Sequence, residues 1–63
     1  MTDEELRAAY DRCARRMREG ESYATPRPTT CDVHIEISRA RIVVDREDIQ
    51  VRCHALKLTL ADG

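Results

Sequence analysis

The sequence predicts an α+β fold in which one N-terminal helix packs on an antiparallel sheet of three strands, or of four. Two observations lead to this prediction. In the first third of the chain, apolar residues recur every three or four positions, the period of an amphipathic helix. In the second half they alternate with polar residues, the period of a half-buried strand. We expect one small domain over residues 1–63, with a helix at 3–19, a linker at 21–30 and a sheet at 33–60.

The predicted helix has clear start and stop signals. Thr2 and Glu5 have the spacing of a capping box, in which each side chain accepts a hydrogen bond from an otherwise unpaired backbone N–H. Acidic residues follow at the positive end of the helix dipole, and Gly20 suits the residue after the last turn. The apolar stripe of this helix consists of Leu6, Ala9, Tyr10, Cys13, Ala14 and Met17.

The segment at 21–30 carries Pro26 and Pro28, which exclude a helix interior and favour extended backbone. The alternating residues after it are Val33, Ile35 and Ile37; Ile49, Val51 and Cys53; and Leu56, Leu58 and Leu60. A short apolar run at 42–44 separates the first two groups. We expect the helix stripe to pack against Val33, Ile35, Ile49 and Val51. No internal repeat is evident.

The apolar positions change parity twice, and each change requires a turn or a bulge. The first lies within 38–41 and the second at His54–Ala55, where we prefer a bulge in one long strand to a turn that creates a fourth strand. The polar segment Asp45–Asp48 has the length of a hairpin loop.

The composition limits what this chain can be. It has 63 residues with 11 basic and 12 acidic side chains, so no strong overall charge points to nucleic acid or to a membrane surface. Phe and Trp are absent, which predicts a thin core that self-association would help to stabilise. The first residues lack the pattern of a secretory signal, so we expect a cytoplasmic protein whose three cysteines stay reduced.

Two cysteines and two histidines form the one cluster with metal-ligand chemistry. Cys31 and His34 have the spacing of half a zinc site, and Cys53 and His54 are adjacent. On strands, the two histidines point away from the face that holds the cysteines, so the four side chains do not converge. We therefore expect no metal and no other cofactor, and treat the four residues as low-ranking zinc candidates. The histidines together with Glu36 remain an alternative pH-sensitive or weak metal patch.

Other site classes find less support in the sequence. A Cys31–His34 pair lacks the concave volume and the orienting group that nucleophilic catalysis needs, so we expect no enzyme. Arginines cluster near the end of the helix, but acidic residues interleave with them and no sheet aromatics are available to stack on bases. A nucleic-acid-binding regulator is accordingly the first alternative, and a zinc-stabilised domain is the second.

These observations favour a small non-enzymatic protein-binding module that inhibits or regulates by covering a partner's surface. By analogy of size and composition, such a chain would suit an accessory protein of a phage or mobile element that blocks a host machine. The candidate partner-binding residues are Leu56, Leu58 and Leu60 on an expected edge strand, with Arg39 and Arg41 beside the sheet. Because an exposed apolar edge is a site for strand pairing, we expect a homodimer, or a foreign protein docked at that edge.

Overall fold

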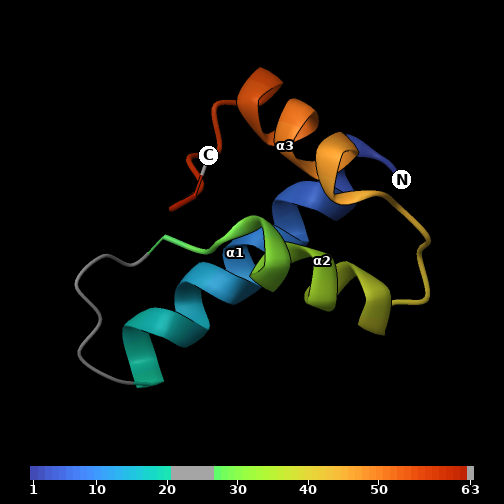
Figure 1. The fold of residues 1–63 in the computed structure, drawn as a ribbon. Coiled ribbons are helices and arrows are strands. Elements are labelled where there is room, and N and C mark those ends of the chain that lie inside the picture. Colours follow the sequence, from blue (N-terminus) through green and yellow to red (C-terminus); the bar gives the residue numbers. More distant parts are fainter. Residues whose placement is uncertain (21–26, 63) are drawn as a thin grey trace.

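The computed structural model describes residues 1–20 and 27–62, and within them the chain forms three α-helices (Figure 1). These are α1 (Asp3–Gly20), α2 (Thr30–Arg39) and α3 (Arg46–Ala55). The predicted α+β class is wrong, because the described residues contain no strand and the expected sheet at 33–60 is a pair of helices. The linker expected at 21–30 falls mostly outside the described residues, and its last residue already belongs to α2.

The N-terminal helix begins and buries its face as the sequence indicates. The backbone N–H of Thr2 donates to Glu5 Oε1 at 2.7 Å, and the Glu5 N–H donates to Thr2 Oγ1 at 3.1 Å, which completes a capping box. Leu6, Ala9 and Cys13 are buried along one side of α1. This side contacts both other helices, and α2 more extensively than α3.

The alternating pattern does not exclude a helix. Each group of three apolar residues spans only five positions, and so short a group also fits the helical period. Residues four apart share a helix face, whereas the residue midway between them points to the opposite side. In α2, Val33 and Ile37 are buried, while Ile35 between them is 47% exposed. In α3, Ile49 and Cys53 are likewise buried, and Val51 is 67% exposed. The prediction that Ile35 and Val51 belong to the core is therefore wrong.

Both later helices carry start signals that the hairpin prediction overlooked. Thr29 is the N-cap of α2 and forms a reciprocal capping box with Asp32. Asp45 is the N-cap of α3, and the acidic residues Glu47 and Asp48 lie in its first turn, where the helix dipole favours them. The segment Asp45–Asp48 thus begins a helix instead of forming a hairpin loop.

Both later helices also end in the same hydrogen-bonded turn, a Schellman motif. After α2, the Arg41 N–H donates to Ser38 O at 2.9 Å, and the Ile42 N–H donates to Ile37 O at 3.3 Å. After α3, the N–H groups of Lys57 and Leu58 make the two equivalent bonds, to His54 O at 3.1 Å and to Cys53 O at 2.8 Å. The predicted bulge at His54–Ala55 is wrong, because these two residues are the last of α3.

In each of these turns one residue adopts the left-handed backbone conformation, and in neither turn is that residue glycine. Arg41 has φ 63° and Lys57 has φ 61°, the only two positive-φ residues in the part of the chain that the structure describes. An L-residue in this conformation costs about 1–2 kcal/mol, which is why glycine usually occupies the position. Each turn folds the next residue, Ile42 or Leu58, back against the core.

The two helices and their turns constitute a structural repeat that the sequence did not reveal. Adding 16 to the residue numbers of α2 gives the bounds of α3. The same shift relates the N-caps, Thr29 (φ −87°, ψ 167°) and Asp45 (φ −81°, ψ 152°). It also relates the C-caps, which are Ala40 (φ −83°, ψ 5°) and Leu56 (φ −91°, ψ 2°).

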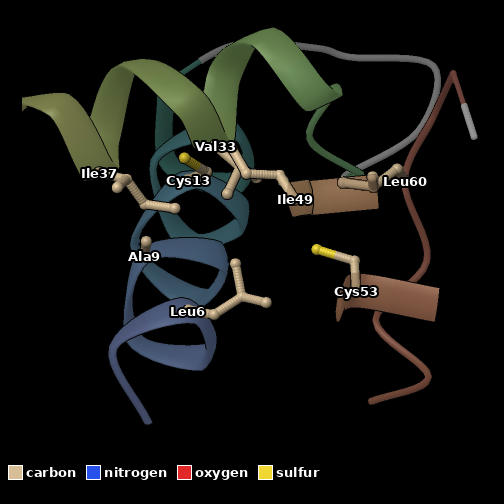
Figure 2. Close-up of a cluster of buried hydrophobic side chains, with 8 residues drawn as sticks. All are labelled: Leu6, Ala9, Cys13, Val33, Ile37, Ile49, Cys53 and Leu60. Carbon is tan, nitrogen blue, oxygen red and sulfur yellow. The ribbon is translucent and has the colours of Figure 1, made fainter. Parts of the chain in front are cut away.

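The core is a single layer in which α1 faces the two repeated units (Figure 2). Its buried apolar side chains are Leu6, Ala9, Cys13, Val33, Ile37, Ile49, Cys53 and Leu60. After α3 the chain returns to the start of α2, where the Ala61 N–H donates to Pro28 O at 2.9 Å. Asp62 Oδ1 accepts there from the Thr30 N–H at 2.9 Å. These bonds hold Leu60 in the core.

We predict that Arg41→Gly and Lys57→Gly each raise the free energy of unfolding by about 0.5–1 kcal/mol. Relief of about 1–2 kcal/mol of backbone strain outweighs the larger entropy that glycine adds to the unfolded chain. Arg39→Gly is the matched control, because Arg39 is helical and glycine there should lower stability by about 0.5–1 kcal/mol. Urea denaturation followed by circular dichroism measures all three variants. A loss of stability in both turn variants would contradict the left-handed assignment.

Candidate functional site

Two open hollows lie at the C-terminal ends of α2 and α3. The first hollow, about 440 Å³, is lined by His34, Ser38, Arg41, Ile42, Val43 and Val44. The second hollow, about 380 Å³, is lined by Gln50, His54, Lys57, Leu58, Thr59, Leu60 and Asp62. The 16-residue shift converts every residue of the first hollow into a residue of the second. The repeat in the backbone therefore produces a repeat in the surface.

The first hollow joins an apolar wall to one cation. Val43 is 100% exposed, the most exposed large apolar side chain among the described residues, and it lies between the half-buried Ile42 and Val44. The left-handed turn places Arg41 beside this wall. His34 and Ser38 supply an imidazole and a hydroxyl from the last two turns of α2. No carboxylate is among the lining residues.

The second hollow has a similar wall, with more polar groups. Leu58 and Leu60 form its apolar part, and the side chains of His54 and Lys57 line it as well. Asp62 also lines it, but the Thr30 N–H and hydroxyl both donate to its Oδ1, at 2.9 and 3.1 Å. The hydrogen bond from the Thr30 backbone lowers the pKa of Asp62 and keeps this carboxylate ionised.

The predicted partner-binding residues divide between these hollows and the core. Leu58 lines the second hollow, and Leu60 lines it while being only 7% exposed. Leu56 is half-buried against the core, so the three leucines do not form an exposed row, and no edge strand exists in the described residues. Arg41 lines the first hollow, whereas Arg39 is exposed in the last turn of α2 and is not among its lining residues.

The four candidate metal ligands are not brought together. Cys53 is buried in the core and Cys31 is exposed in the first turn of α2. His34 and His54 lie in different hollows. Within residues 1–20 and 27–62, no three His, Cys, Asp or Glu side chains are placed to hold one metal ion. All three cysteines are free thiols, and burial raises the pKa of both Cys13 and Cys53.

A nearly buried carboxylate fastens α2 to α1. Glu36 is 7% exposed and accepts hydrogen bonds from Arg12 Nε at 2.9 Å and from Arg16 Nη2 at 3.2 Å. The hydrogen bond from Arg12 is the main reason why the pKa of Glu36 lies below its usual value of 4.5. Two arginines of the basic cluster in α1 are thereby engaged within the protein, which weakens the case for a phosphate-binding surface.

The equivalent residue of the second unit makes the opposite ion pairs. Arg52 replaces Glu36 after the 16-residue shift, and its Nη1 lies 3.2 Å from Met1 O and 3.9 Å from Asp3 Oδ1. Its Nε donates to Asp48 at 2.9 Å. Asp3 at the start of α1 therefore faces α3, and Arg12 and Arg16 in its second half face α2.

Val43 and Lys57 were not among the predicted site residues, because both were expected on or beside strands. The signal that would have found them is the 16-residue spacing of two short segments, Arg41–Ile42 and Lys57–Leu58. In each, a basic residue follows the last turn of a helix and an aliphatic residue comes next. That order is the pattern of a Schellman turn with its apolar contact.

No family model, no curated protein and no solved structure matches this chain. None of the helices in the described part combines the length and apolar character needed to cross a bilayer.

We predict that Glu36 contributes to acid sensitivity. Its folded pKa is lowered, so its stabilising contribution is complete above the usual pKa of 4.5 and disappears as the pH falls through the folded value. Glu36→Gln should cost about 1–2 kcal/mol at pH 7, since screening of the half-exposed arginines limits the effect. It should also flatten the decline of Tm below pH 4.5.

Thermal unfolding between pH 7 and pH 3 checks this, with the exposed Glu19→Gln as control. Glu5 and Asp62 also have lowered pKa values and should supply the remaining acid dependence. An unchanged pH profile in Glu36→Gln would refute the role of this ion pair.

Proposed function

We propose that this protein is a non-enzymatic binding module whose first hollow receives an acidic, amphipathic segment of a partner protein. The observation that carries the proposal is the wholly exposed Val43 next to the left-handed Arg41. Full burial of a valine side chain is worth about 1.5–3 kcal/mol, and a free monomer gains none of it here. An aliphatic side chain of a partner would pack on the wall formed by Val43 and its neighbours.

Charge complementarity supports an acidic occupant. The hollow has a cation and no carboxylate among its lining residues, so a partner's Asp or Glu side chain finds a favourable position beside Arg41. Glycine at this turn would cost less strain, yet the chain carries arginine. The arginine interacts favourably with the C-terminal end of α2 and also places a positive charge at the hollow. An exposed pair of this kind sets orientation and selectivity more than affinity.

The same geometry favours binding over catalysis. His34 and Ser38 are one helical turn apart, but a serine nucleophile needs a base that is itself oriented by a third group, typically a carboxylate. The lining residues include no such group, and a rim residue that is fully exposed cannot exclude water from a reaction. A regulator or inhibitor that works by covering a partner's surface fits a hollow of this kind. The cytosol, which keeps thiols reduced, is the compartment we propose for it.

We predict that Val43→Asp abolishes partner capture and that Val51→Asp does not. Both valines are exposed, so both variants should fold, but only Val43 lines the first hollow. The new carboxylate removes apolar area and repels an acidic segment. Tagged wild type and both variants are incubated with lysate from the source cells, and retained proteins are quantified by mass spectrometry. The expected result is a protein retained by wild type and Val51→Asp but reduced about tenfold or more by Val43→Asp.

The retained protein is then purified and titrated into the ¹⁵N-labelled chain, where backbone shifts should map to residues 41–44. An identical retained set for Val43→Asp and wild type would refute the proposal. Light scattering of the free protein tests whether a second copy of this chain occupies the first hollow. A dimer mass for wild type that becomes a monomer mass in Val43→Asp would show that a second copy fills the hollow, contrary to the proposal.

A further inference from the structure

We propose that the second hollow is a second, weaker binding site for the same class of acidic, apolar-anchored segment, so that one chain carries two related docking sites. This inference rests on the proposed function of the first hollow. It follows from the 16-residue repeat, which relates the two sites position by position.

Part of the chemistry of the first hollow recurs in the second. A basic residue occupies the left-handed turn in both, Arg41 at φ 63° and Lys57 at φ 61°. The residue after the cation, Ile42 or Leu58, packs against the core in both hollows. The third residue after the cation, Val44 or Leu60, is aliphatic as well. Both cations stand at places where glycine would relieve the backbone strain, and each presents its charge to a hollow.

An imidazole also lies in each hollow, although it comes from different positions of the repeat. Each hollow is lined by two positions of its helix, 34 and 38 in the first hollow and 50 and 54 in the second. Histidine occupies the earlier position in the first hollow and the later position in the second. Each hollow therefore offers a cation and an imidazole beside an apolar wall. An Asp or Glu side chain next to a leucine in a partner is the ligand chemistry common to both.

The two sites should differ in strength. Asp62 lines only the second hollow and opposes an acidic ligand, although its Oδ1 already accepts two hydrogen bonds from Thr30. Thr59 replaces the wholly exposed Val43, so the second wall has less apolar surface to bury. The second hollow is accordingly the weaker site. A partner that presents two such motifs on a linker of suitable length gains affinity from the pair beyond that of either site alone.

The test is a titration of the ¹⁵N-labelled full chain with a defined probe. The probe is a synthetic peptide, blocked at both ends, that contains one Glu-Leu-Asp motif between Gly-Ser flanks, and its Gln-Leu-Asn counterpart is the uncharged control. We expect saturable amide shifts in two separate groups, at 41–44 and at 57–60, with the weaker Kd at the second. The uncharged peptide should bind about fivefold more weakly at both.

Single-site variants assign each group of shifts. Lys57→Gln should weaken binding about fivefold at 57–60 and leave the Kd at 41–44 unchanged, and Arg41→Gln should do the reverse. Arg15→Gln, an exposed cation of α1 outside both hollows, should change neither. Lys57→Gly separates function from stability, since it should raise Tm while weakening binding at the second hollow.

The outcomes distinguish the two proposals. Shifts confined to 41–44, with a Kd insensitive to Lys57→Gln, would overturn the second site and leave the first intact. The absence of saturable shifts at both groups, at millimolar peptide, would overturn both. Two groups of shifts that respond separately to the two variants would establish both sites.

Discussion

The left-handed residue at the end of each short helix is the constraint on which the rest of this structure depends. Without a residue at positive φ after α2, the chain would not bring Ile42 back onto the core next to Ile37. Lys57 does the same for Leu58 after α3. The turns thus complete a core that has few side chains. They also create the hollows, because each turn leaves a cation and an apolar wall at the surface.

Opposite charges favour the observed order of the two repeated units along α1. Glu36 of α2 forms ion pairs with Arg12 and Arg16 in the second half of α1. Arg52 of α3 forms an ion pair with Asp3 at the start of α1. Exchanging the units would bring like charges together at both places. The arrangement seen in Figure 1 is the one that avoids this repulsion.

The sequence allowed α1 to be predicted with its cap and its buried face, because three signals agree over 18 residues. It did not distinguish strands from helices in the second half. Each apolar triplet there is only five residues long, and Val33 with Ile37 fits both periods. The deciding evidence was local, in the Thr29–Asp32 capping box and in the acids after Asp45, which prevail over the β-branched composition. The hollows were not predictable without the turns, since the exposed Val43 lies in the segment that follows the left-handed turn after α2.

Solution NMR of the two turns tests the central claim that they are equivalent and left-handed. We predict helical ¹³Cα shifts over 30–39 and 46–55, with a strong intraresidue HN–Hα NOE at Arg41 and again at Lys57. Extended ¹³Cα shifts over 33–38 and 49–54, with cross-strand NOEs between them, would contradict it. A left-handed signature at only one of the two residues would disprove the repeat, and with it the equivalence of the two hollows.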